Sequence, residues 1–398
     1  MRVLMIAPTS FFSDYGGHIR ILEEMRALGE LGVDVAVVTY YMGKDVPGLD
    51  IRRTAPLPWH TDYEVGSSRH KIAFDAYLTI RSFKEVLRFR PHIIHGHMHE
   101  GALIGGVLAR LMGIPLVFDY QGSLTAEMVD HHFLNPRGAF YPWAYRVESF
   151  ITRRLPHAIL TSSGQAMALL RDQFKVSPAR LHALPDCADA SHFDPARFRH
   201  FAAADHPLRA IYNIPADATI VGYLGLLTDY QGIPHLIESA VELRRRGENV
   251  HFLVMGYPNV EHYQAIARLR GVDDVVTFTG RVPFSDAPYY LSACDIAVAP
   301  KMSTSEGSGK LLNYMAMALP IVAYDTAVNR EYLGELGVYA LPGDVGAFTA
   351  AIDELVHNPP RRIELGLQLR KRVMELFSWH AAAERVLSIY QNLDKQHE

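Results

Sequence analysis

The chain has 398 residues, of which 49% are hydrophobic, and its formal net charge is −4 at pH 7. This length exceeds the size at which a single core usually stops growing, so we expect two domains. The near balance of charge argues against a nucleic-acid binder, and the two cysteines, Cys187 and Cys294, predict neither a disulfide framework nor a cysteine-rich metal site. The apolar N-terminus, MRVLMIAP, is too short for the core of a signal peptide, so we expect a cytoplasmic protein.

Short apolar runs alternate with amphipathic helical patterns along the first half of the chain. Such alternation predicts a mostly parallel, doubly wound α/β sheet. The loop after the first strand contains the glycine pair Gly16 and Gly17. The expected strands are 3–7, 35–40, 92–95, 116–120 and 158–161, and the expected helices are 18–31, 71–89, 101–111 and 141–154.

A second series of the same kind follows a turn-rich stretch at 184–198. We expect an N-terminal Rossmann-like domain over 1–198, a second one over 199–376, and a C-terminal helix in 377–398 that returns to the first domain. Two doubly wound domains can direct their strand ends into one interdomain cleft, where ligands usually bind. The expected strands of the second domain are 220–224, 250–255, 275–279, 296–299, 321–324 and 338–341.

Residues 295–325, DIAVAPKMSTSEGSGKLLNYMAMALPIVAYD, predict a strand, a turn rich in small residues, a helix and a strand. The helix begins beside the carboxyl end of a strand, where its free N–H groups and dipole favour an anion. Lys310, in the first turn, adds a positive charge. An ordinary strand–helix–strand crossover without any ligand explains the segment equally well, unless the rest of the chain supplies a matching cleft. Our hypothesis is that the segment binds a phosphate-bearing ligand.

A set of motifs runs in order along nearly the whole chain. It consists of Tyr15-Gly16-Gly17-His18, PHIIHGH at 91–97, FTGRVP at 278–283, DIAVAP at 295–300, KLLNYMAMALPIVA at 310–323 and FSWHAAAERVLSIY at 377–390. The ordered set resembles that of the family-4 glycosyltransferases of the GT-B fold. This resemblance implies two Rossmann-like domains that face a cleft, and a retaining transfer of a sugar from a nucleotide donor to an acceptor.

The resemblance also implies a role for each matching site residue. Gly16 and Gly17 would approach the donor diphosphate, since only glycine lets the backbone come so close. The backbone at Arg281 and Val282 would recognise the base. The distal phosphate would rest on Ser308, Gly309 and Lys310, with Asn313 on the ribose. The catalytic positions would be Glu306 and Gln121 at the donor sugar, together with His97.

Several of these positions depart from the family pattern. Leu226 and Gln231 stand where the family usually has an arginine and a lysine that neutralise the diphosphate. Asn313 replaces a glutamate, Glu306 lies one residue beyond the matching position, which is Ser305, and Gln121 replaces a histidine. The loss of two positive charges favours an alternative function, a weakly active or inactive binding or partner subunit.

Three further patterns allow a functional and a structural interpretation. His95, His97 and His99 alternate before Glu100, which suits a metal site or cleft-lining histidines; we expect no metal. Glu127, Asp130 and His131 fall within one helical turn and are acceptor-side candidates or a solvated face. Basic and apolar residues interleave over 69–90, as in a core-packed helix or one in peripheral contact with the inner membrane face.

The sequence therefore predicts a metal-independent glycosyltransferase of the hexosyltransferase type. Its co-substrate would be a UDP- or GDP-linked sugar, with no separate cofactor. The acceptor would be a glycan or lipid-linked hydroxyl.

Overall fold

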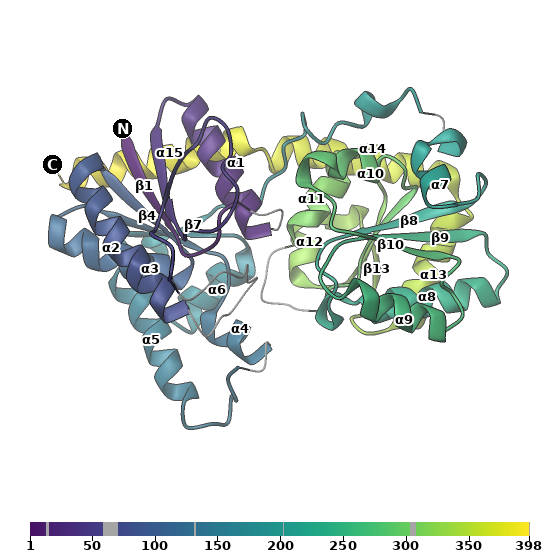
Figure 1. The fold of residues 1–398 in the computed structure, drawn as a ribbon, viewed down its shortest axis with the longest axis horizontal. Helices are drawn as coiled ribbons and strands as arrows, with labels where there is room; N and C mark the ends of the chain where they lie inside the picture. The colour runs from purple at the N-terminus through teal and green to yellow at the C-terminus, as the bar shows by residue number, and fades with distance from the viewer. Residues whose placement is uncertain (13–15, 59–70, 131–132, 202, 303–307, 398) are drawn as a thin grey trace. The chain divides into compact units, whose positions relative to one another are not determined.

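The computed structural model describes residues 1–12, 16–58, 71–130, 133–201, 203–302 and 308–397. They form two compact units (Figure 1). The first contains the described residues of Met1–Pro185 and Trp379–Glu398, and the second contains those of Asp186–Thr304 and Ser308–Ser378.

The first unit is built on a parallel sheet of seven strands in the order β3-β2-β1-β4-β5-β6-β7. Its strands are β1 (Arg2–Ala7), β2 (Asp34–Thr39), β3 (Asp50–Arg53), β4 (Ile93–His97), β5 (Leu116–Tyr120), β6 (Ala158–Thr161) and β7 (Leu181–Ala183). Its helices are α1 (Gly16–Glu30), α2 (Lys71–Phe89), α3 (Met98–Met112), α4 (Leu124–Asp130), α5 (Tyr141–Arg154), α6 (Gly164–Asp172) and α15 (Trp379–His397).

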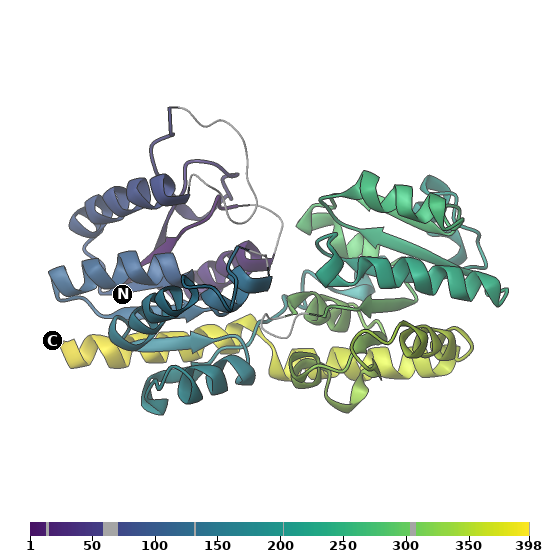
Figure 2. The same cartoon turned by 90° about the horizontal axis from the view of Figure 1, so that it is seen from below.

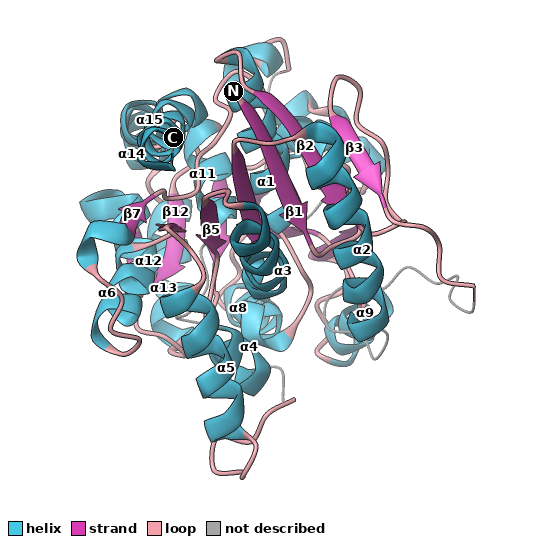
Figure 3. Cartoon of the chain, turned by 90° about the vertical axis from the view of Figure 1, so that its left-hand side faces the viewer, coloured by secondary structure: helices cyan, strands magenta, loops and turns pink. Residues whose placement is uncertain are grey.

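Helices cover both faces of this sheet, which explains why its central strands are apolar nearly throughout. In Figure 2, α2 and α15 lie on opposite sides of the first sheet. Helices α2, α3 and α5 pack on one face, and α1 packs with α15 on the other. Figure 3 shows α2 and α3 on the near side of the strands β1 and β2. Every residue of β4 and β5 is buried.

Two strands of the first sheet are absent from the sequence prediction. β3 has the sequence DIRR and β7 has only three residues, LHA, so neither gives an apolar run. Both are edge strands of the sheet, and each pairs with a single neighbouring strand. An edge strand does not have to be buried on both faces, so it does not need a run of apolar residues. β4 also ends at His97 rather than His95, and α3 follows it directly at Met98.

The second unit contains a parallel sheet of six strands in the order β10-β9-β8-β11-β12-β13. These are β8 (Thr219–Leu224), β9 (Val250–Met255), β10 (Val276–Gly280), β11 (Ile296–Ala299), β12 (Ile321–Tyr324) and β13 (Val338–Ala340). The helices are α7 (Pro207–Ile211), α8 (Ile233–Arg245), α9 (Val260–Leu269), α10 (Ala287–Leu291), α11 (Gly309–Ala316), α12 (Ala327–Leu333), α13 (Val345–Val356) and α14 (Pro359–Leu376). The strand order is that of a Rossmann fold, so both domains belong to the expected class.

The boundary between the units falls at Pro185 and not at residue 198. Phe193 explains the difference, because its fully buried ring belongs to the core of the second unit. Arg370 of α14 fixes the same stretch by donating to the Phe193 carbonyl at 3.0 Å and to Asp194 Oδ1 at 2.9 Å. Helix α15 belongs to the first unit, where it packs along α1.

Among the described residues, none of the helices combines the length and the hydropathy that crossing a bilayer requires.

Candidate functional site

The strand order of the second sheet reverses between β8 and β11. In an open α/β sheet, ligands bind outside the carboxyl ends of the strands at this point. Here β8 ends at Leu224 and is followed by Gly225, and β11 leads into Pro300 and the buried Lys301. The candidate site of the second unit is therefore the edge formed by these two strand ends and the start of α11.

Lys310, in the first turn of α11, is held at the end of β8. Its ammonium group donates to the Tyr223 hydroxyl at 2.9 Å and to Gln231 Oε1 at 2.9 Å. It also lies 4.2 Å from the centroid of the Tyr223 ring, within the range of a cation–π contact. The Tyr223 hydroxyl donates in turn to the Leu226 carbonyl at 2.8 Å. Burial raises the pKa of Tyr223 well above its ordinary value, so the phenol stays neutral beside the ammonium.

Glycine is required where β8 ends. Gly225 has a φ of +152°, which side-chain-bearing residues rarely adopt, and a Cβ there would lie 2.6 Å from Lys310 Nζ. The close approach of this backbone to the ammonium therefore depends on the absence of a side chain. Gln231 stands where the family usually has a lysine. It adds no positive charge of its own, and its side-chain carbonyl accepts a hydrogen bond from the Lys310 ammonium.

Ser308 precedes α11 in the N-cap position, but its side chain makes no capping hydrogen bond. The residue is buried, and its Oγ has no hydrogen-bond partner among the described residues. An unpaired buried hydroxyl is costly unless a ligand or water completes it. Asn313 lies one turn further on the same face as Lys310 and is half-buried. The start of α11 thus offers a hydroxyl, free helix N–H groups, an ammonium and an amide.

Of the other site residues predicted in the second half of the chain, Leu226, Arg281 and Val282 lie along the same sheet edge. Leu226 is half-buried and follows β8 directly. Arg281 and Val282 follow β10; Arg281 is exposed with its guanidinium 5.2 Å from the Tyr257 ring, and Val282 is buried. Glu306 lies outside the described residues.

The first unit brings Gly17 and Gln121 together. A Cβ at Gly17 would lie 3.2 Å from Gln121 Oε1, so any larger residue would displace the amide. The other end of that amide donates from Nε2 to Asp119 Oδ2 at 2.8 Å. Gln121 follows β5, and Gly16 and Gly17 open α1, so these residues meet at the carboxyl edge of the sheet.

A buried polar network lies beneath Gln121. Arg20 of α1 forms a forked ion pair with Asp119, with Nη2 2.8 Å from Oδ1 and Nε 3.0 Å from Oδ2. His97, fully buried, contacts Asp119 Oδ2 through Nδ1 at 3.1 Å. Burial alone would raise the pKa of Asp119, but Arg20 and His97 hold it well below the ordinary value. The carboxylate is therefore ionised and fixes the orientation of Gln121.

The three alternating histidines do not form one cluster. His95 and His97 lie two residues apart on one strand, face α1 and α15, and stack at 4.5 Å. His99 belongs to α3 instead and contacts Phe118, Tyr120 and Glu148. His97 and His99, expected at the surface of a cleft, are both buried, because the strand continues to His97 and the helix starts immediately after it.

Glu24, His95, His97 and Asp119 form one of two groups among the described residues that could hold a metal ion. Each offers one ligand atom, all are buried, and these atoms lie within 4.8 Å of one another. Arg20 already bonds both oxygens of Asp119, however, so a cation there would have to compete with a guanidinium. A second group, Glu248, Asp353 and His357, lies on the second unit and is partly exposed.

Glu24 has an unusual environment within this network. Neither carboxyl oxygen has a hydrogen-bond partner among the described residues, and the Nδ1 atom of the His95 ring lies 3.7 Å from Oε1. Burial, with a smaller contribution from the Asp119 charge, raises the pKa of Glu24 to about 7. Burial also lowers the pKa of His95 well below its ordinary value, so that ring stays neutral.

We predict that Glu24 makes the protein less stable as the pH rises. A carboxyl group that binds its proton more tightly in the folded state loses stability from the unfolded pKa of 4.5 up to about 7. Glu24→Gln, which is neutral at every pH, should therefore be more stable than the native chain above pH 7, by up to about 3 kcal/mol. Chemical denaturation at pH 5 and pH 8 checks this. Equal pH dependence of the two proteins would show that Glu24 is ionised without cost.

The acceptor-side candidates lie on or beside α4. The buried carboxylate of Glu148 on α5 fixes the start of this helix by accepting from the Leu124 and Thr125 N–H groups, each at 3.0 Å. Glu127 is half-buried on α4, and Asp130 is its last residue. His131 lies outside the described residues. Their assignment to the acceptor remains a prediction.

Sequence reasoning missed the residues that organise both sites. Arg20 and Glu24 read as ordinary polar positions of an amphipathic helix, and Asp119 reads as one charge within a strand. Tyr223 reads as a core aromatic. Lys301 gave a usable signal, because it is a lysine two residues after the predicted strand 296–299, near the expected ligand-binding end of the sheet. In the structure it is only 5% exposed.

Two family models match the chain, one in each half. The model described as a glycosyl transferase 4-like domain matches residues 16–187, and the model described as glycosyl transferases group 1 matches residues 218–358. Together they span most of both Rossmann-like domains.

Curated relatives match nearly the whole length. The chain is 25% identical to the 2-deoxystreptamine glucosyltransferase of Streptomyces kanamyceticus, over 94% of this chain and 98% of that protein. It is 26% identical to the MMP alpha-(1->4)-mannosyltransferase of Mycolicibacterium hassiacum, over 98% of each.

Solved structures show the same fold at lower identity. Sucrose-phosphate synthase from Thermosynechococcus elongatus superposes with a TM-score of 0.82 at 19% identity, over 98% of both chains. HepE from Anabaena, solved in complex with UDP and glucose, gives a TM-score of 0.77 at 14% identity, over 98% of this chain and 100% of that one.

Two Rossmann-like domains, an anion-compatible helix start at the switch point of the second sheet and these relatives define an enzyme that transfers glycosyl groups. The chain belongs to the family-4 glycosyltransferases of the GT-B fold.

Proposed function

We propose that this glycosyltransferase moves a hexosyl group from a nucleotide sugar to an acceptor hydroxyl with retention of configuration. The second unit would bind the donor and the first unit the acceptor. The observation that carries the proposal is the Lys310 ammonium, held by Tyr223 and Gln231 beside the start of α11. The interdomain cleft expected from the sequence remains part of this proposal.

The donor diphosphate would lie on the N–H groups of Ser308 and Gly309 and on the Lys310 ammonium. Asn313 would bond the ribose, the backbone at Arg281 and Val282 would contact the base, and Gly16 and Gly17 would leave room for the phosphates. Lys310 compensates in part for the family's missing cations at Leu226 and Gln231, since a single charge at close range still neutralises developing negative charge. The Gln231 carbonyl orients that ammonium instead.

Retention would follow from attack on the same face as the departing phosphate. The leaving phosphate oxygen would accept the proton of the acceptor hydroxyl as the new glycosidic bond forms and the sugar–phosphate bond breaks. Gln121 and Glu306 would bond the sugar. His97, which is fully buried, enters the proposal as a positioning residue that acts through Asp119 on Gln121. The transfer needs no metal and no further cofactor.

The base of the nucleotide donor and the chemical class of the acceptor are also part of the proposal. Similar solved structures hold UDP with glucose, and starch synthase IV from Arabidopsis holds ADP with acarbose. We propose a UDP- or GDP-linked sugar, and a glycan or lipid-linked acceptor on the side of Glu127 and Asp130.

Peripheral contact with an anionic membrane through residues 69–90 completes the proposal. Within this stretch, α2 exposes the apolar side chains Ile72, Ile80, Phe83 and Leu87 beside basic residues of its outer face. Such a face suits the boundary between headgroups and acyl chains. It equally suits a solvated helix, so vesicle binding decides between the two.

A thermal-shift panel tests the donor proposal. UDP, GDP and ADP, each alone and linked to glucose or mannose, should include one nucleotide that raises the melting temperature, since a ligand that binds only the folded state stabilises it. At a concentration about a hundredfold above its dissociation constant, the gain is about 2.7 kcal/mol. If none of them stabilises the protein at millimolar concentration, the alternative of a binding subunit without transfer activity gains support.

A further inference from the structure

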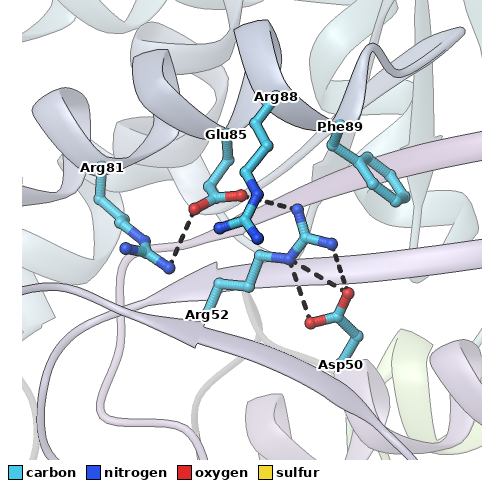
Figure 4. Close-up of a pocket in the computed structure, with 6 residues that line it drawn as sticks. All are labelled: Asp50, Arg52, Arg81, Glu85, Arg88 and Phe89. Atoms are coloured by element: carbon cyan, nitrogen blue, oxygen red, sulfur yellow. Dashed lines mark hydrogen bonds and ion pairs between the residues drawn. The ribbon is translucent and has the colours of Figure 1, made fainter.

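The first unit carries a pocket that the proposed transfer does not use. It has a volume of about 410 Å³ and lies between strand β3 and helix α2 (Figure 4). This size is within the range of small-molecule sites. Its lining is unusually rich in charge, and it consists of Asp50, Arg52, Arg81, Glu85, Arg88 and Phe89.

The pocket lies away from the sheet edge that carries Gln121. Asp50 is the first residue of β3, and Phe89 is the last residue of α2. The chain just after α2 is fixed to the start of β1, because the Arg2 side chain donates from Nε to the Arg90 carbonyl at 2.9 Å. The pocket is therefore at the amino end of the strands, whereas Gly17 and Gln121 are at the carboxyl end.

Three guanidinium groups face two carboxylates in this pocket. Arg52 donates to Asp50 through Nε at 3.1 Å and to Glu85 through Nη1 at 2.7 Å. Arg81 pairs with Glu85 at 2.9 Å, and Glu85 itself is only 3% exposed. These contacts neutralise both carboxylates and leave one net positive charge.

Two groups in the pocket still have donors to offer. Arg88 forms no hydrogen bond or ion pair with any described residue, although it is exposed and lines the pocket. The Nε atom of Arg81 is buried and has no hydrogen-bond partner among the described residues. A favourable interaction with the dipole of α2 would also explain an arginine in its last turn. It would not explain why Arg88 lines a pocket or why the buried Nε of Arg81 has no hydrogen-bond partner among the described residues.

We propose that this pocket binds a phosphate-bearing ligand. Planar guanidinium groups match the geometry of phosphate oxygens, and several of them together form charge-assisted hydrogen bonds. The ring of Phe89, with the Arg52 guanidinium 4.5 Å from its centroid, supplies an apolar wall for an organic substituent. The source of the phosphate is either a soluble phosphorylated compound or the headgroup of an anionic lipid.

Arg88→Gln and Arg146→Gln form a matched pair for testing the pocket. Both residues are exposed on helices of the first unit, and each substitution removes one guanidinium group, but only Arg88 lines the pocket and Arg146 lies on α5, outside residues 69–90. The probes are inorganic phosphate, followed by equilibrium dialysis, and vesicles of phosphatidylcholine with or without phosphatidic acid, followed by co-sedimentation. Phosphate bound at any other site contributes equally to both variants.

We expect Arg88→Gln to weaken phosphate binding about tenfold and Arg146→Gln to change it less than about twofold. Loss of vesicle binding in Arg88→Gln alone, and only with phosphatidic acid present, assigns the pocket to a lipid headgroup. Selective loss of free phosphate binding without any vesicle binding assigns it to a soluble ligand. Equal behaviour of the two variants toward both probes overturns the proposal.

Discussion

Replacing Lys310 with alanine should weaken binding of the nucleotide sugar about tenfold to a hundredfold. A hydrogen bond to a charged group contributes about 1.5–3 kcal/mol, and Lys310 is the cation held at the switch point of the second sheet. The turnover number should fall further, by about a hundredfold to a thousandfold, because negative charge on the leaving diphosphate grows in the transition state. Calorimetric titration with the donor and a nucleotide-release assay measure the two effects.

Lys371→Ala is the control for this substitution. Lys371 belongs to α14 of the same unit, is 77% exposed and lies 3.9 Å from Glu375. Its removal changes the net charge by the same amount and should leave both measurements unchanged. If Lys310→Ala binds the donor as tightly as Lys371→Ala does, the diphosphate lies elsewhere.

Replacing Arg20 with methionine should lower the free energy of unfolding by about 3–5 kcal/mol. Arg20 and Asp119 are 4% and 0% exposed, and removal of one partner leaves a buried charge without its counter-ion. The double variant Arg20→Met with Asp119→Asn should recover part of the loss, because it removes the charge as well. Denaturant unfolding of the two variants, together with Asp119→Asn, measures this coupling.

The exposed pair Arg171 and Asp172 provides the contrast. It lies in the first unit with both side chains more than half exposed. Arg171→Met should therefore change stability little, since water and salt screen exposed pairs. A double variant no more stable than Arg20→Met alone would contradict the account of the buried pair.

The sequence predicts the two sheets well because their strands are buried on both faces. Runs such as VLMIA in β1 and IAVA in β11 are continuous and apolar, so their positions follow from composition alone. β3 and β7 escape prediction because edge strands do not require such runs. The boundary at Pro185 escapes it because Phe193 lies within a turn-rich stretch, where one aromatic ring gives no periodic signal.

The sites are less predictable, because their geometry joins residues far apart in the chain. Motifs predict Lys310 in the first turn of a helix, where the structure has it, and Gly17 in the loop after the first strand, although it lies in the first turn of α1. No local pattern shows that Gln231, 79 residues before Lys310, accepts its hydrogen bond, or that Arg20 and Asp119 pair across 99 residues. The spacing of the histidines left a metal site and cleft-lining side chains as alternatives, with no metal expected. The transition from strand to helix after His97 separates His99 from the other two.

The most direct test of the proposed donor site compares a nucleoside diphosphate with its monophosphate by calorimetric titration. The base is that of the nucleotide identified in the thermal-shift panel, and the proteins are the native chain and Lys310→Ala. The native chain should bind the diphosphate at least about tenfold more tightly than the monophosphate, and Lys310→Ala should lose most of this preference. Equal affinity of the native chain for the two nucleotides, or an unchanged preference in Lys310→Ala, would contradict the assignment of the distal phosphate to the start of α11.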